Sequence, residues 1–346
     1  MRLSLTCCCL FSLIATTPLY AQESAEIIEW IKERDGQVQS QNNLHSVMFP
    51  PSVELTDEDL RKLSQLDGLF LLHAGGVEIS DAGLKQLKQA EDLRDLALFQ
   101  SKITDEGLKM LGKSPRLMGI IVMSEEVFTK EGLLGIAANR NLMRIFLSKS
   151  DIADEDLAVV SQWPRLKDFV VEAPQLTDSS FQHFADRLEL RYLGFAHAKI
   201  TGEGLQHLVG LRNLQRVYLK DCPVEDQYLK HLSKIPILSV VDLSRSKVTG
   251  KGLIALQNLP ALELLTLDGT QIQDQNLKVL SDFPALRELS LQNTKITDAG
   301  LESLAQLNNV RYLNLTGCKV TMAGIKELRK NFPENAVLWE PENINR

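Results

Sequence analysis

The chain has 346 residues, of which 44% are apolar and 24% charged, and its formal net charge is −7 at pH 7. This composition is ordinary for a globular protein and supplies ample apolar material for a core. No cluster of lysine and arginine stands out, so nothing indicates a surface for nucleic acid or for an anionic membrane.

The chain begins with a pattern typical of a secretory signal peptide. Arg2 precedes an apolar run over residues 3–14, and Ala21 supplies a small residue at the end of the segment. We expect residues 1–21 to be removed, which predicts a secreted or periplasmic protein. The alternative is an intracellular chain with an apolar start by chance. The apolar run is too short to cross a bilayer, and no later stretch predicts a membrane span.

From residue 69 onward a unit of 24 residues recurs with the pattern L-x-x-L-x-L-x-x-[T/S/C]-x-I-T-D-x-G-L-x-x-L-x-x-L-P-x. Only the step from Leu117 to Leu142 has an extra residue. Leucines at positions 4 and 6 predict a strand with both side chains inward. Threonine at position 12 favours a helix N-cap, aspartate at 13 suits the helix dipole, and leucines at 16, 19 and 22 follow helical spacing.

A single strand–helix unit cannot bury its own apolar faces, so the units must stack. The sequence therefore predicts an α/β solenoid of about 11 repeats of 24 residues, curved like a horseshoe, with a parallel β-sheet on the concave face and short helices on the convex face. Residues 22–52 are predicted to form an N-terminal cap helix and a first strand. Residues 53–332 hold the repeats, and residues 333–346 form a C-terminal cap.

The string L-x-x-L-x-L-x-x-T-x-I-T-D-A-G-L resembles the cysteine-containing class of leucine-rich repeats. That class is familiar from F-box substrate receptors and abundant in secreted proteins of planctomycete-type bacteria. The leader, the cap helix ending in Arg34-Asp35-Gly36 and the ending AGIKELRKNFPENAVL are similar to the bacterial set. The resemblance implies a leucine-rich repeat binding scaffold with no shared catalytic residues and no cofactor. Most copies here lack the class cysteine, and residues 22–50 leave no room for an F-box.

No motif predicts an enzyme or a metal site. The mature chain lacks G-x-S-x-G, H-E-x-x-H, C-x-x-C and a glycine-rich phosphate loop. Carboxylates recur at position 13, and we interpret them as helix-start residues, because a calcium site needs several oxygen ligands within one turn. They are Asp81, Asp105, Asp154, Asp178, Asp226, Asp274 and Asp298. His183, His207 and His231 share position 18, but helices roughly 8–10 Å apart hold them too far from one another for one metal.

Cys222 and Cys318 occupy position 9 of units that lie four repeats apart. A strand spacing of about 4.8 Å separates them by roughly 19 Å, whereas a disulfide needs Cα atoms within about 7 Å. We expect both to be unpaired, buried thiols. We also expect the stack to be weakest over residues 117–189, where the extra residue, Pro174, Phe181 and Phe184 depart from the repeat.

Positions 3, 5 and 7 of each strand face the concave side, and their side chains are not needed to fill the core. Position 5 is polar in the C-terminal half, with Asp242, Thr266, Ser290 and Asn314, and apolar in the N-terminal half. An exposed apolar patch often marks an interaction site, and tyrosine and arginine often anchor interfaces. The predicted partner-binding residues are Ala97, Phe99, Ile121, Met123, Phe146, Val170, Tyr192, Arg216 and Tyr218. Two alternatives stay open: residues 37–50 fold over this patch, or its side chains only pack on each other.

Two classes of function remain. The first is a monomeric module that binds another protein, or a glycan, outside the cytoplasm. The second is a structural protein that self-associates in a cell envelope. An adaptor for degradation is a weaker third, because the signal peptide weighs against it. The sequence does not name the partner.

Overall fold

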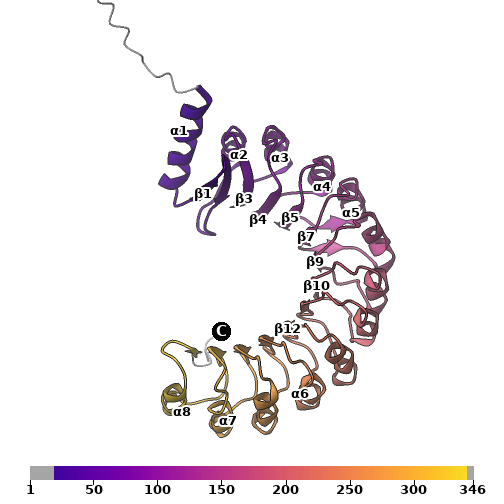
Figure 1. Cartoon of the computed structure of the whole chain (residues 1–346), viewed down its shortest axis with the longest axis vertical. Helices are drawn as coiled ribbons and strands as arrows, with labels where there is room; N and C mark the ends of the chain where they lie inside the picture. The colour runs from indigo at the N-terminus through magenta and orange to yellow at the C-terminus, as the bar shows by residue number, and fades with distance from the viewer. Residues whose placement is uncertain (1–18, 341–346) are drawn as a thin grey trace, which may run out of the picture.

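A computed structural model describes residues 19–340 of the chain. One continuous sheet lines the concave side of a horseshoe, and the helices lie on its convex side (Figure 1). Its strands pair in chain order and in parallel, except for β1, which is antiparallel to β2 at the N-terminal edge. This confirms the predicted α/β solenoid. Most of the predicted signal peptide lies outside the described residues.

The sheet has 14 strands. In spatial order they are β1 (Gln37–Gln41), β2 (Leu44–Met48), β3 (Leu69–Gly75), β4 (Asp95–Ser101), β5 (Gly119–Ser124), β7 (Arg144–Leu147), β9 (Asp168–Glu172), β10 (Tyr192–Ala196), β11 (Arg216–Tyr218), β12 (Val240–Asp242), β13 (Leu264–Thr266), β14 (Glu288–Ser290), β15 (Tyr312–Asn314) and β16 (Val337–Leu338).

The convex side carries short α-helices in some repeats and 3-10 helices in others. The α-helices are α1 (Leu19–Glu33), α2 (Asp57–Leu63), α3 (Asp81–Gln86), α4 (Asp105–Gly112), α5 (Lys130–Ile136), α6 (Gly250–Leu256), α7 (Asp298–Leu304) and α8 (Met322–Leu328). The 3-10 helices are η1 (Leu87–Gln89), η2 (Asp154–Gln162), η3 (Asp178–Phe184), η4 (Glu203–Leu208), η5 (Asp226–Lys234), η6 (Asp274–Asp282) and η7 (Arg329–Asn331).

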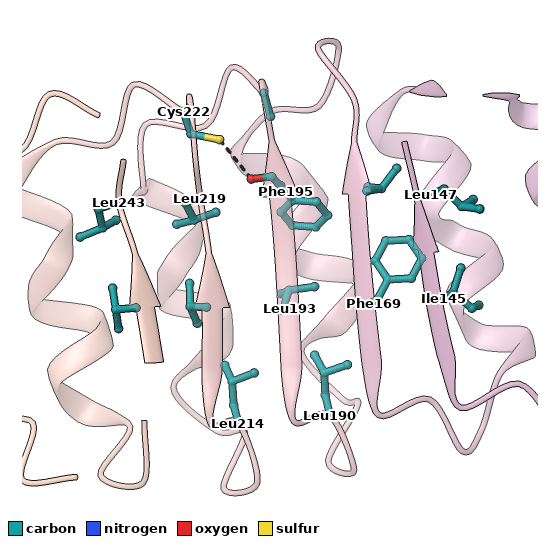
Figure 2. Close-up of a cluster of buried hydrophobic side chains, with 14 of the residues drawn as sticks. Ile145, Leu147, Phe169, Leu190, Leu193, Phe195, Leu214, Leu219, Cys222 and Leu243 are labelled. Atoms are coloured by element: carbon teal, nitrogen blue, oxygen red, sulfur yellow. Dashed lines mark hydrogen bonds between the residues drawn. The ribbon is translucent and has the colours of Figure 1, made fainter. Parts of the chain in front are cut away.

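The core runs through the whole horseshoe between sheet and helices. Leu289 and Leu291, at positions 4 and 6 of their repeat, are fully buried, as the alternation predicts. Figure 2 shows the same arrangement farther along the sheet, where Leu193 and Phe195 of β10 lie between the inward side chains of the neighbouring strands. Each repeat therefore completes the core of the repeat beside it.

The position-13 aspartates link each repeat to the next. The Asp274 carboxylate accepts a hydrogen bond from the Thr297 backbone N–H at 2.8 Å and one from the Thr297 hydroxyl at 2.7 Å. Thr297 itself caps α7 by accepting from the Ala299 N–H at 3.3 Å. A Cβ on Gly300 would stand only 2.5 Å from Asp274 Oδ1, so glycine at position 15 makes room for the carboxylate of the preceding repeat. The T-D-x-G motif is thus an inter-repeat joint.

Repeats that lack this pair have complementary substitutions. Where Lys130 replaces the aspartate, Asp156 stands at position 15 of the next repeat, and Lys130 Nζ lies 3.0 Å from Asp156 Oδ1. Where position 13 is Gly250, the next repeat places the Asn276 side chain in the freed space. The joint is a matched contact between neighbours.

A small second sheet joins the unit that starts at Leu117 to the next unit, at positions where other repeats have single parallel bridges. It consists of β6 (Phe128–Thr129) and β8 (Ser150–Asp151), which pair in parallel. The extra residue of this unit stays local, since the register of the main sheet continues from β5 to β7.

The two ends of the stack differ in construction. At the N-terminal end, α1 buries Ile27 and Ile31, and the Trp30 ring meets Phe49 edge-on with centroids 6.3 Å apart. At the C-terminal end, β16 adds a short parallel strand beside β15.

The described cysteines are buried free thiols at the expected register. Figure 2 shows the Cys222 thiol directed at the Phe195 carbonyl, to which it donates a hydrogen bond at 3.4 Å. Burial raises the pKa of the Cys222 thiol to about 12. Burial also raises the pKa of the Cys318 thiol. Both groups are therefore uncharged at neutral pH.

Candidate functional site

The predicted partner-binding residues lie on six neighbouring strands, β4, β5, β7, β9, β10 and β11. At position 5, Ile121 pairs in register with Phe146, and Phe146 pairs with Val170. At position 3, Tyr192 pairs with Arg216. The tertiary structure thus gathers these side chains into one surface on the concave face, which we call the concave patch.

Exposure differs along the concave patch. Phe99 is 40% exposed and Arg216 is exposed, whereas Ile121, Phe146 and Tyr192 are half-buried. Met123, Val170 and Tyr218 are half-buried as well. Ala97 is fully buried, because its small side chain lies in register between His73 and Ile121. The expectation that Ala97 is free to meet a partner is therefore wrong.

Aromatic side chains hold the middle of the concave patch in place. The rings of Phe146 and Tyr192 meet edge-to-face with centroids 5.4 Å apart, an arrangement that stabilises aromatic pairs. Gly194 leaves room for the side chains on both sides of it, since a Cβ there would stand 3.1 Å from both Tyr218 and Val170. The Phe146 and Tyr192 rings thus restrict each other's rotamers at the middle of the concave patch.

A chain of charges runs beside the apolar row. Arg144 Nη1 donates to Asp95 Oδ2 at 2.7 Å, and its Nε lies 3.5 Å from Asp168 Oδ2. Asp95 and Arg144 come from β4 and β7, with β5 between them. The arginine reaches across because the intervening residue is Gly119, whose added Cβ would stand 2.6 Å from the Asp95 carboxylate. Sequence reasoning missed this chain, although three position-3 residues carried the signal.

One end of this chain has unused hydrogen-bonding capacity. His73 Nε2 and Asp95 Oδ1 lie 3.7 Å apart, and both atoms are buried without a hydrogen-bond partner among the described residues. Buried polar atoms are usually paired, so this end of the chain of charges lacks hydrogen bonds that its buried atoms could form.

The C-terminal half of the concave face is polar and acidic. Asp242 accepts hydrogen bonds from the Ser244 backbone at 2.8 Å and the Ser244 hydroxyl at 2.6 Å. Burial nevertheless raises the pKa of the Asp242 carboxyl above its ordinary value. Burial and the nearby Asp242 carboxylate also raise the pKa of the Tyr218 phenol. Both groups therefore lie in a poorly solvated region at the border of the concave patch.

Residues 37–50 do not cover the concave patch. They form β1 and β2, a hairpin whose second strand pairs with β3 at the edge of the sheet. The alternative in which this segment folds over the patch is therefore wrong, and the concave patch is open along β4 to β11.

The histidines and aspartates that recur along the repeats gather no metal site. The residues described contain no group of three or more metal-ligating side chains that could hold an ion. Burial lowers the pKa of His231 below its ordinary value, as do Lys230 and Lys234 beside it. The aspartates serve the inter-repeat joint instead.

The period, the parallel sheet and the outer helices decide the fold. The protein is a leucine-rich repeat solenoid. A leucine-rich repeat family model matches residues 90–112, 284–305 and 306–328. No curated protein matches the sequence. Among solved structures, the solenoid is similar to an internalin of Listeria monocytogenes, with 19% identity, a TM-score of 0.54, and coverage of 80% of this chain and 76% of that one. At this identity the likeness concerns the fold.

The comparisons point to no enzyme family. Among the helices of the described part of the chain, none has the length and apolar character that a bilayer crossing requires. The solenoid is a repeat scaffold of a kind suited to binding proteins. A more specific function has to be argued from the concave patch.

Proposed function

We propose that this solenoid is a non-catalytic scaffold, located outside the cytoplasm, that captures a protein partner on its concave patch. The observation that carries the proposal is the set of ordered aromatic and apolar side chains on six adjacent strands, open to solvent and bordered by charges. Clusters of tyrosine, tryptophan and arginine in well-packed surroundings dominate the energetics of many interfaces.

The extracytoplasmic location rests on the predicted signal peptide at residues 1–21. In the proposed division of the remaining chain, residues 22–52 form an N-terminal cap, residues 53–332 the repeats, and residues 333–346 a C-terminal cap. A glycan is a second kind of ligand, because half-exposed tyrosines beside carboxylates, as with Tyr218 and Asp242, suit sugar rings and hydroxyls. The protein partner is favoured, because the patch combines large apolar side chains with few free polar groups.

The substitution Phe146→Asp tests this proposal. It places a charge at the centre of the concave patch, so we expect loss of partner capture. The melting temperature should fall by only a few degrees, because Phe146 is half-buried and its ring pair with Tyr192 is worth about 1 kcal/mol. The measurement is quantitative affinity capture from the native extract, with the recovered partner then titrated as a purified protein.

Ile254→Asp is the matched control. Ile254 lies on α6 of the convex side and is 55% exposed, so the same type of change should leave binding intact. If Phe146→Asp retained the partner, the binding site would lie elsewhere, and the polar C-terminal half would be the next surface to test. A large loss of stability would instead identify Phe146 as a core residue.

A further inference from the structure

A cavity of about 470 Å³ opens on the flank of the solenoid, away from the concave patch. It lies where α3 and α4 run back toward the next strands, and its walls include Leu84, Leu87, Leu96, Met110 and Leu111. Pockets that bind small molecules in proteins commonly measure about 300–1,000 Å³ and are mostly apolar. This cavity lies within that size range, and most of its lining is apolar.

The cavity has a cause in the sequence. At position 22 of the repeat, most units bury a large apolar side chain that fills this flank. These side chains belong to Leu66, Trp163, Leu211, Ile235, Leu259, Phe283 and Leu307. Two consecutive units have Ala90 and Ser114 instead, and both residues line the cavity.

The rim of the cavity carries positive charge although the protein as a whole is acidic. Lys88, Lys113 and Arg116 line it, against the single carboxylate of Glu91. Arg116 lies 3.9 Å from that carboxylate and 3.8 Å from Asp92. Among the described residues, neither Lys88 nor Lys113 forms an ion pair, and both are exposed. Two cationic side chains are thus free to meet an anion at the mouth of an apolar chamber.

We propose that this cavity binds a small amphiphile with an anionic headgroup, such as a medium-chain carboxylate. The aliphatic chain lies between Leu87 and Met110, where it replaces the two missing position-22 side chains, and the carboxylate meets Lys88 and Lys113 at the rim. The site is separate from the concave patch and does not depend on the proposed function.

The experiment titrates the full mature protein with decanoate, and with decanol as the uncharged analogue, by calorimetry below the micelle concentration. We expect decanoate to bind more tightly than decanol. The substitutions Ala90→Leu and Ser114→Leu restore the usual residue at position 22, so the double variant should lose binding of both probes while melting at a higher temperature.

The substitutions Lys88→Glu and Lys113→Glu should weaken decanoate binding severalfold and leave decanol binding unchanged. The control is Lys230→Glu with Lys234→Glu on η5, which alters the same number of exposed lysines at a distant site and should change neither titration. Equal affinity for decanoate and decanol in the unaltered protein would overturn the anionic headgroup.

A second measurement follows the methyl NMR signal of Met110 in the unaltered protein, so that the result does not depend on any variant folding. Decanoate should shift this signal and leave that of Met322, on α8, in place. An unmoved Met110 signal, or decanoate binding that survives the Ala90→Leu and Ser114→Leu substitutions, would show the cavity to be a packing gap only and overturn the proposal.

Discussion

At the residue scale, the aspartate that opens each helix couples one repeat to the next. Asp274 accepts both hydrogen bonds of Thr297 and occupies the space that Gly300 leaves free. The carboxylate therefore contributes to stability across a boundary between repeats, in addition to any interaction with its own helix.

A double-mutant cycle tests this joint. Gly300→Ala alone should destabilise the solenoid, because the new Cβ meets the Asp274 carboxylate. Asp274→Ala alone should cost about 1–2 kcal/mol, because it leaves the Thr297 donors without their acceptor. In the double variant the carboxylate is gone, so the added methyl should cost less, with a coupling on the order of 1 kcal/mol in the free energy of unfolding.

Denaturant unfolding of the four proteins measures this coupling. The pairing of Gly250 with Asn276 in the natural chain shows that the joint accepts a large group when the aspartate is absent. Strictly additive effects would mean that Asp274 and Gly300 do not interact.

Asp242, on the concave face, is a carboxylate whose burial lowers the stability of the folded protein. Burial raises the pKa of its carboxyl in the folded protein, so the ionised form is less stable there than in the unfolded chain. Three repeats farther on, position 5 is Asn314, whose Oδ1 accepts from the Thr316 N–H at 3.0 Å in the same manner.

We expect Asp242→Asn to raise the melting temperature at neutral pH by about 1–3 °C. The asparagine keeps the hydrogen bond from Ser244 but has no charge to desolvate. As the pH falls through the raised pKa, the wild-type carboxylate becomes protonated in the folded state, and the difference between the two proteins should shrink. Thermal melts from neutral to acidic pH measure it; a difference that grew on acidification would contradict the expected direction.

At the element scale, residues 117–189 depart most from the regular unit. They contain β6 and β8, the inserted residue, and Pro174 in place of a small polar residue at position 9. The buried Trp163 ring nitrogen has no hydrogen-bond partner among the described residues. Aromatic packing instead stabilises this region, since the Phe181 and Phe195 ring centroids lie 5.2 Å apart.

We expect backbone amides of residues 117–189 to exchange with solvent faster than those of residues 238–309, because irregular packing lowers the free energy of local opening. Hydrogen exchange followed by mass spectrometry compares the two segments in one experiment. Equal protection would show that the aromatic contacts of η3 compensate fully for the irregular backbone.

At the scale of the whole molecule, a solenoid ends in two sheet edges that are able to pair with another copy. The edge strand β1 is short and polar, and most of its side chains are exposed. The other edge, β16, spans only Val337–Leu338. Short and polar edges discourage edge-to-edge pairing.

We therefore expect a monomer whose mass by light scattering is independent of protein concentration. A mass that rises with concentration would favour the alternative of a self-associating envelope protein. In that case, substitution of Val38, whose side chain is half-buried on β1, by lysine would test whether the N-terminal edge forms the contact.

The solenoid could be predicted from the sequence, because a period of 24 residues fixes a strand and a helix in every unit and no unit is stable alone. The strand positions that face the core could be predicted as well, since side chains alternate along a strand. Tyr192 and Arg216 could thus be assigned to one face without coordinates, and Cys222 and Cys318 to distant strands.

The contacts between side chains of different repeats could not be predicted from the sequence, because they depend on how the repeats stack. Asp95 and Arg144 are 49 residues apart in sequence, and they touch only because stacking brings them to either side of Gly119. Ala97 is buried by taller neighbours, which its own position in the repeat does not predict. The flank cavity likewise depends on Ala90 and Ser114 falling side by side, because a void arises only where two neighbouring repeats both lack the filling side chain.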